Sequence, residues 1–297
     1  MAFSRYLNPK NDVAFKKIFG SEKNKDIVIH FLNDIIGSFK NSHIVEIDFL
    51  PTILIPNSDA QKISIVDVLC KDREGAKYII EMQVSSTRGF EKRAQHYAAK
   101  VYSDQARVGQ EYQDLKEIIF LAIADDIIFP NKAHYKSDHI VMDNKTYEHD
   151  LKDFYFTFIE LPKFKKNKEE LFSMEEKWCY FFKHAHETTE SDLERILGSN
   201  NIIHKAYSAL NQFYWTEGEL LAYDANQRIN MDHKAILDKK YDEGEAKGIE
   251  KEKIQTAKRL LQDGLAIDLI SRYTDLSKEQ IEDLRKYTLE EPSVVNF

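Results

Sequence analysis

The chain is poor in the residues and patterns that several classes of protein require. Its 297 residues include two cysteines, Cys70 and Cys179, which lie far apart in unlike contexts. This argues against a disulfide framework and a cysteine-based zinc site, and it fits a reducing compartment. No apolar run approaches the roughly 18 residues of a membrane span, and the N-terminus lacks the apolar segment of a signal peptide. We therefore expect a cytoplasmic protein with no membrane partner.

Several common catalytic patterns are also missing. The chain has no glycine-rich phosphate-binding loop, so no nucleotide cofactor is expected. No serine stands in a G-x-S-x-G elbow, and neither cysteine has an obvious activating partner. His184, His186 and Glu187 lack the spacing of a zinc protease. The net charge of −8 counts against broad, non-specific nucleic-acid binding, but it leaves room for a locally basic cleft.

The most informative segment that the chain does contain is 62–85, which reads as a β-hairpin. Both arms are rich in β-branched and aromatic residues, and the link between them, 73–75, is polar and ends in glycine. A three-residue hairpin loop usually ends in a residue with positive φ, which Gly75 adopts without steric cost. The sequence therefore predicts that Asp72 pairs with Ala76.

This register places two acidic side chains directly opposite each other. Asp67 faces Glu81, and Gln83 points to the same side two residues further on. Directly opposed Cβ atoms lie about 4.5–5.5 Å apart, so the two carboxylates ionise together only with a cation between them. Oxygen ligands in this arrangement suit Mg²⁺, and the alternative is a structural ion pair.

Apolar residues on both faces of the two arms predict strands that are buried on both sides, where an unpaired acid is costly. These residues are Ile63, Ile65, Val66, Val68, Leu69, Ile79, Ile80 and Met82.

Further motifs accompany the hairpin along the chain. They are the segments 8–12, 15–20, 31–33, 91–94 with Tyr97, and 160–164. Together and in this order they resemble the Rpn family of recombination-promoting nucleases, also described as PD-(D/E)XK nuclease family transposases. The resemblance covers about residues 5–230. It implies an α/β fold with a mixed central sheet flanked by helices, and a metal-dependent DNA endonuclease linked to recombination or mobile elements.

The resemblance also implies roles for individual residues. Asp67 and Glu81, with the backbone carbonyl of Met82, would hold Mg²⁺ or another divalent cation. Asp12 on the first helix would be a further ligand, although an acid near a helix start is otherwise a cap or dipole partner. Gln83 stands where the superfamily signature has lysine. A neutral amide cannot act as a base or add positive charge, but it can orient the attacking water.

The segment 90–106 is expected to form a helix with an apolar stripe beside a basic one. Arg93, Lys100 and Arg107 recur at seven-residue steps, with His96 nearby. Cations in such a stripe would anchor DNA phosphates beside the acidic site, whereas the alternative is a charged face in solvent. In the superfamily that the chain resembles, this helix flanks the active site, which favours a role for Arg93.

The order of elements predicts a nuclease-like core over 1–165, a helical extension over 166–232, and a charged linker with a helix-turn-helix-like tail over 233–297. Expected core elements are helices within 12–37 split near Gly20, and strands at 44–55, 117–124, 139–142 and 154–161. Capping-box spacing predicts later helices that start at Ser173, Ser191 and Ser277.

Two other functions remain open from the sequence, a non-cleaving DNA-binding or recombination accessory protein and an interaction protein that oligomerises through its tail. The cations of the tail are interspersed with acids, so no recognition helix stands out as basic. We therefore expect the tail to form homo-oligomers rather than to read DNA, and we expect DNA to be the main partner of the core.

Overall fold

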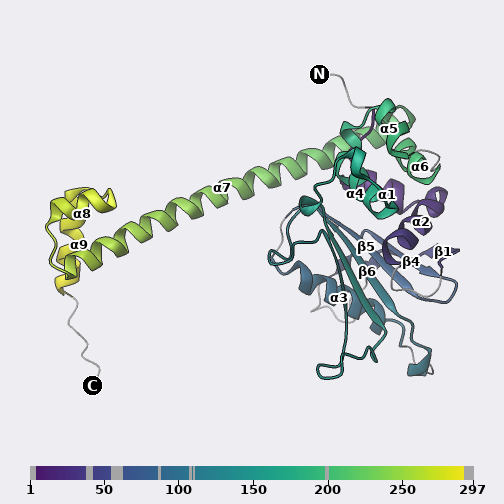
Figure 1. Cartoon of the computed structure of the whole chain (residues 1–297), viewed down its shortest axis with the longest axis horizontal. Coiled ribbons are helices and arrows are strands. Elements are labelled where there is room, and N and C mark those ends of the chain that lie inside the picture. Colours follow the sequence, from purple (N-terminus) through teal and green to yellow (C-terminus); the bar gives the residue numbers. More distant parts are fainter. Residues whose placement is uncertain are drawn as a thin grey trace. The chain divides into compact units, whose positions relative to one another are not determined.

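The structure is a computed structural model, and it describes residues 5–37, 43–54, 63–85, 88–106, 109, 111–197 and 201–290. The predicted DNA-binding residue Arg107 lies outside the described residues. Internal contacts divide the chain into two units, Met1–Arg228 and Ile229–Phe297. Helix α7 (Glu217–Gln262) begins in the first unit and continues into the second (Figure 1).

A six-stranded mixed sheet in the order β1-β4-β5-β6-β8-β7 forms the centre of the first unit (Figure 1). The strands are β1 (Ile47–Phe49), β4 (Val68–Asp72), β5 (Lys77–Gln83), β6 (Ile118–Ala124), β7 (Lys136–Ile140) and β8 (Phe154–Glu160). Strands β5, β6 and β8 are parallel, and the other pairs are antiparallel. Strand β6 is buried along its whole length, as expected where both faces of a parallel sheet are covered. A separate two-stranded sheet pairs β2 (Ile53–Leu54) with β3 (Ser64–Ile65).

Helices cover both faces of the sheet and bury two separate hydrophobic clusters. One cluster joins a face of the sheet to α1 (Asp12–Phe19), α2 (Lys25–Ile36), α4 (Met174–His184), α5 (Glu190–Leu197) and α6 (Asn201–Leu210). The other cluster joins the opposite face to α3 (Phe90–Ser103). Alternate residues of β4, β5, β6 and β8 enter different clusters, since side chains in a strand point to opposite faces. The helices beyond residue 166 therefore share a core with the N-terminal helices.

Short 3₁₀ helices connect many of these elements. They are η1 (Glu22–Asn24), η2 (Tyr112–Asp114), η3 (Leu161–Lys163), η4 (Lys168–Glu170), η5 (Ala185–Glu187) and η6 (Gln212–Tyr214).

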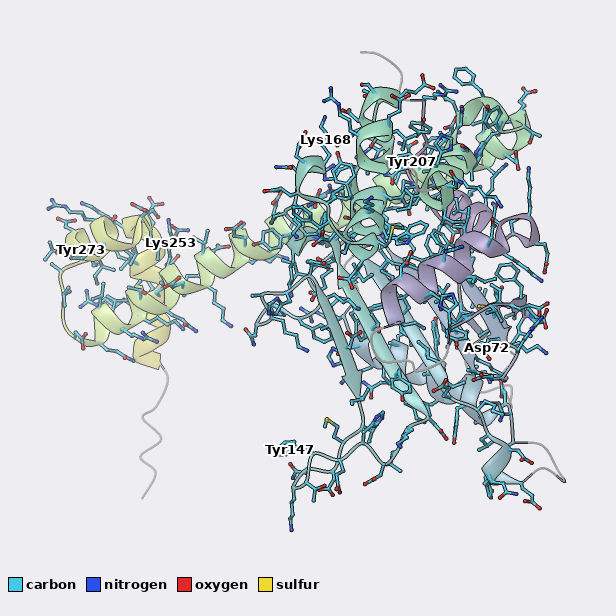
Figure 2. All side chains as sticks on the ribbon, turned by 45° about the vertical axis from the view of Figure 1, so that its right-hand side comes forward. Asp72, Tyr147, Lys168, Tyr207, Lys253 and Tyr273 are labelled. Carbon is cyan, nitrogen blue, oxygen red and sulfur yellow. The ribbon has the colours of Figure 1, made fainter. Side chains whose placement is uncertain are left out.

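The predicted hairpin register is confirmed. Val68 pairs with Ile80, and Asp72 N–H donates to the carbonyl of Ala76 at 3.0 Å. Gly75 has φ 91°, which is the left-handed conformation that the turn requires. Asp72, labelled in Figure 2, stabilises the turn because its Oδ1 accepts from Ala76 N–H at 3.0 Å.

Other local predictions need correction. Ile63 and Ile65 are exposed rather than buried, because this part of the arm forms β3 outside the main sheet. The strand expected over 44–55 is interrupted between β1 and β2, where Pro51 cannot donate a ladder hydrogen bond. The helix expected to start at Ser191 starts earlier, as Thr189 Oγ1 accepts from Asp192 N–H at 3.2 Å.

The predicted helix starts at Ser173 and Ser277 are confirmed. The Ser173 side chain accepts from Glu176 N–H in a capping box. Gln280 N–H donates to Ser277 Oγ at 3.1 Å, and Ser277 N–H donates back to the Gln280 side chain at 2.9 Å.

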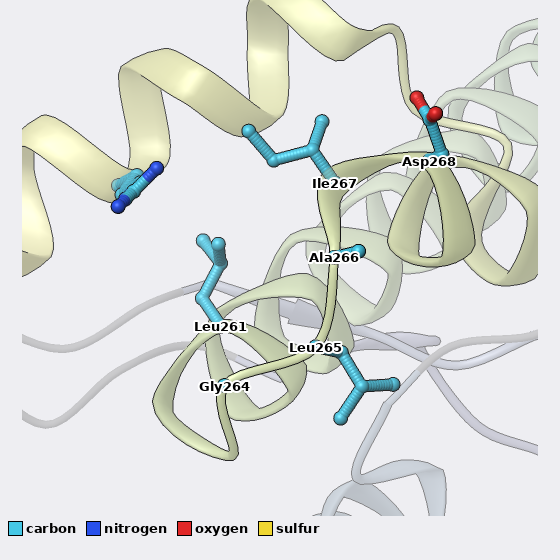
Figure 3. A pocket seen from close by; sticks show the side chains of 7 residues that line it. Leu261, Gly264, Leu265, Ala266, Ile267 and Asp268 are labelled. Atoms are coloured by element: carbon cyan, nitrogen blue, oxygen red, sulfur yellow. The ribbon is translucent and has the colours of Figure 1, made fainter.

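The second unit is a small helical assembly made by the end of α7, α8 (Ile267–Thr274) and α9 (Lys278–Glu290). Its hydrophobic cluster consists of the buried residues Ala257, Ile270, Leu276 and Ile281. A pocket of about 400 Å³ lies at the turn between α7 and α8, with Gly264 at φ 79° and the side chains of Leu261 and Ile267 around it (Figure 3). In the described residues no helix is long and apolar enough to cross a membrane.

Candidate active site

The two acids that the sequence places opposite each other lie where β4 begins and β5 approaches its end. They are joined by crossed hydrogen bonds between side chain and backbone. Asp67 N–H donates to Glu81 Oε1 at 3.0 Å, and Met82 N–H donates to Asp67 Oδ2 at 2.9 Å. Side-chain oxygens therefore accept the two amide protons that an uninterrupted ladder would direct to carbonyls, which accounts for the start of β4 at Val68, directly after Asp67.

Both carboxyl groups have raised pKa values. Glu81 is 6% exposed, and burial followed by the charge of Asp67 raises the pKa of Glu81 to about 8. Burial also raises the pKa of Asp67 to about 6, with the Met82 N–H opposing the shift and the charge of Asp12 adding to it. The site therefore disfavours two negative charges unless a cation neutralises them.

The raised pKa values predict that the metal-free protein loses stability as pH rises from about 4 to about 8. The folded carboxyls of Asp67 and Glu81 bind protons more tightly than ordinary carboxyls do. Over this window the folded state holds more protons than the unfolded state, so the free energy of unfolding falls with pH. Thermal melting at a series of pH values measures this. Glu81→Gln should flatten the curve, and an unchanged slope in that variant would contradict the assignment.

Helix α1 brings a third acid and a lysine to the pair. Asn11 caps the helix, since its side chain accepts from Val13 N–H. The four-residue spacing along α1 then places Lys16 Nζ 2.9 Å from Asp12 Oδ1. Lys16 Nζ also lies 3.8 Å from Asp67 Oδ1. The structure thus brings Asp12 beside the acid pair, and its role as a metal ligand stays a prediction. It also adds Lys16, for which the four-residue spacing from Asp12 was the available sequence signal.

An arginine approaches the pair from the opposite face of the sheet. Gly89, at φ 76°, turns the chain into α3, and Arg93 Nη2 in the first turns of that helix donates to Gln83 Oε1. The guanidinium of Arg93 lies 4.8 Å from the ring centroid of Phe90. Its charge opposes the upward shift in the pKa of Glu81. Gln83 therefore orients a guanidinium in this structure, and its amide nitrogen donates to the carbonyl of Ser85.

A cavity of about 190 Å³ lies beside Gln83. It is lined by Gln83, Ser85, Arg88, Gly89, Phe90, Glu91, Asp126, Ile127 and Ile128. The fully buried Glu160 holds one lining residue in place, because its Oε1 accepts from the backbone N–H of Ile128 at 2.7 Å. Lys163 Nζ lies 2.7 Å from Glu160 Oε2. The motif at 160–164 therefore has a structural role next to the candidate site.

Two of the remaining predicted DNA-binding residues, His96 and Lys100, lie in the described part of α3 and differ in exposure. His96 is exposed, whereas the Lys100 side chain is 8% exposed and its Nζ lies 4.0 Å from Asp104 Oδ1. Within α3, the seven-residue spacing therefore places Arg93 and Lys100 on one side of the helix without making Lys100 accessible. A role for His96, Lys100 and Arg107 in binding DNA stays a prediction.

Another ion pair joins the N-terminal motif at 8–12 to the carboxyl edge of the parallel strands. Lys10 Nζ lies 2.6 Å from Asp125 Oδ2, directly after β6. Asp125 N–H in turn donates to the carbonyl of Gln83 at 2.8 Å. The Lys10–Asp125 ion pair therefore fixes the segment before α1 against the end of β5. No sequence pattern indicates this contact.

The donor set is suited to a hard divalent cation with some of its ligands supplied from solvent or substrate. No group of three or more His, Cys, Asp or Glu side chains is arranged for metal binding within the described ranges. Two carboxylates, Asp67 and Glu81, nevertheless converge where negative charge is unfavourable without a cation. Mg²⁺ is commonly held by one or two carboxylates with water and phosphate as further ligands, so the residues present fit it.

The mixed sheet, the acid-bearing hairpin and the helices on both faces define a PD-(D/E)XK α/β fold. The chain belongs to the PD-(D/E)XK nuclease family transposases, because the model of that family matches residues 9–240. No curated protein and no solved structure matches the chain. The family match confirms the resemblance that the sequence motifs indicate, and it supports a nuclease-like or transposase-associated role.

Proposed function

We propose that the protein is a divalent-metal-dependent DNA endonuclease that hydrolyses phosphodiester bonds. The observation that carries this proposal is the buried pair of Asp67 and Glu81, placed by the nuclease fold beside cations from α1 and α3. The family match supports DNA as the proposed substrate and a proposed link to recombination or mobile elements. In this proposal Asp67, Glu81, the carbonyl of Met82 and Asp12 hold Mg²⁺.

Each residue contributes a distinct part of the chemistry. The bound cation would supply charge that polarises the scissile phosphate and activates water. Asp67 and Glu81 would hold the cation through carboxylates that hydrogen bonds with backbone N–H groups keep in place. Arg93, oriented by Gln83, would bind a phosphate oxygen through its planar guanidinium. Gln83 acts as the positioning residue for Arg93 rather than as a base, since its amide carries no titratable proton.

Incubation of supercoiled plasmid with the protein tests the proposal. Nicked or linear product should accumulate with Mg²⁺ and disappear with a chelator. DNA binding without cleavage under any divalent cation would instead favour the accessory-protein alternative.

Replacing Arg93 by Ala should weaken DNA binding with little dependence on base sequence. Phosphate contacts position a nucleic acid without specifying its sequence. The plot of log affinity against log salt should become shallower by about one unit, as for the loss of one phosphate contact. Fluorescence anisotropy with labelled duplexes measures both effects. Lys92→Ala, on an exposed neighbouring position, is the matched control, and an equal effect there would contradict a specific role for Arg93.

We further propose that the tail (residues 233–297) mediates self-association. Helix α7 exposes large apolar side chains within this part of the chain, including Ile236 at 57% and Ile249 at 51%. A variant that ends at residue 232 should therefore form smaller assemblies than the full chain in light scattering. An unchanged assembly with weaker DNA binding would favour DNA reading by the tail.

A further inference from the structure

We propose that Lys16 is a tethered counter-cation of the acid site, which neutralises Asp12 and Asp67 in the metal-free protein and is released by a bound divalent cation to contact a DNA phosphate. The inference rests on the proposed function for the identity of the two ligands. It adds a residue and a conformational step that the acid pair alone does not imply.

The first support is the position of the ammonium group. Lys16 Nζ lies 2.9 Å from Asp12 Oδ1 and 3.8 Å from Asp67 Oδ1, so one cation serves two carboxylates from different elements. Within the described part of the chain, Lys16 is the only Lys, Arg or His side chain with a nitrogen within 4.0 Å of an Asp67 or Glu81 carboxylate oxygen. A divalent cation on the same oxygens would compete with it, since like charges repel at such separations.

The second support is the partial exposure of the Lys16 side chain. The Lys16 side chain is 43% exposed, and it forms ion pairs with Asp12 and Asp67. The next residue differs, because Lys17 Nζ pairs with Glu219 and lies 4.4 Å from the ring centroid of Trp215. Lys16 is thus a partly exposed ammonium at the site, whereas Lys17 holds α1 against α7.

The third support is the positive charge that the site lacks at position 83, where glutamine stands in place of lysine. Gln83 contributes an amide and no charge, and the guanidinium of Arg93 is held by Gln83 on the α3 side. Among the described residues, Lys16 is the cation that α1 brings within 4.0 Å of the acid pair, so it is the group of α1 that is placed to meet an approaching phosphate. A displaced ammonium on a flexible four-carbon stem can turn to such a phosphate without any shift of α1.

Metal affinity is the first measurement. Binding of Mn²⁺ to the full chain is measured for wild type, Lys16→Met and Lys17→Met at about pH 9, where the carboxyls are largely ionised. Removal of the competing ammonium should tighten Mn²⁺ binding about tenfold in Lys16→Met, which is the size of effect that a neighbouring charge has when it moves a pKa by about one. Lys17→Met should match wild type. Unchanged or weaker binding in Lys16→Met would overturn the proposal.

DNA affinity is the second measurement, with Ca²⁺ as the divalent cation and gel analysis to verify that the duplex stays intact. Lys16→Met should lose affinity by about tenfold with the cation and by little without it, and Lys16→Arg should retain the affinity. An equal loss under both conditions would show a fixed phosphate contact and overturn release. Neither measurement needs cleavage, so a protein that binds Mn²⁺ but never cuts would refute the nuclease proposal while these results still decide the role of Lys16.

Discussion

Asp67→Asn and Glu81→Gln should each abolish metal-dependent DNA cleavage. Each change removes a charged ligand while retaining a side-chain oxygen that can accept the backbone hydrogen bond of the native carboxylate. Loss of about 4 kcal/mol of transition-state stabilisation would slow the reaction about a thousandfold. Initial rates of plasmid nicking measure the effect. Asp72→Asn is the control in the same hairpin, because Asp72 stabilises the turn at its other end.

The stability of the same variants distinguishes a metal site from a structural ion pair. In the metal-free protein the buried pair disfavours two negative charges, so replacing one acid by its neutral amide should leave the melting temperature unchanged or raise it near neutral pH. A loss of more than about 2 kcal/mol in the free energy of unfolding would be typical of a broken buried network. That result would contradict a metal site even if cleavage were also lost.

The central hairpin could be predicted because its determinants are local. The position of Gly75 fixes the turn, and the period of two along each strand then fixes the residue opposite Asp67. The buried strand β6 was equally clear from its continuous apolar run. These features depend on residues within a few positions of one another, where turn geometry and alternation determine the outcome.

The surroundings of the site could not be predicted from such patterns. The contact of Lys16 with Asp67 joins residues that are far apart in the chain, and its existence depends on how α1 packs over the sheet. Helical spacing likewise put Arg93 and Lys100 on one side of α3, but it could not show that Lys100 is buried. Periodicity assigns a residue to a face, whereas burial depends on the elements that cover that face.

The site lies at the junction of the two hydrophobic clusters. Strand β5 contributes residues to both clusters, with Ile79 in one and Ile80 in the other. Helix α1 on one face supplies Lys16, and α3 on the other supplies Arg93. The ends of strands that lie between two helical layers can therefore have cations on both sides of an acid pair, although the chain as a whole is acidic.

Glu160→Ala should destabilise the first unit by about 3–5 kcal/mol, the usual cost of removing one partner of a buried ion pair. Glu160 is fully buried, and its carboxylate accepts from the backbone N–H groups of Ile128 and Phe129 at 2.7 and 2.9 Å. Lys163 Nζ lies 2.7 Å from the other oxygen. The alanine variant would leave the ammonium of Lys163 and two amides without this acceptor. Urea denaturation measures the loss.

Two further variants separate the ion pair from the packing around it. Glu170→Ala removes a glutamate from an exposed capping box and should cost about 1 kcal/mol or less. Glu160→Met combined with Lys163→Met removes both charges, so it should be less damaging than Glu160→Ala because no buried charge is left unpaired. A loss below about 1 kcal/mol for Glu160→Ala would contradict this reading. Because Glu160 holds Ile128 at the wall of the cavity beside Gln83, the alanine variant should also weaken DNA binding under conditions where it remains folded.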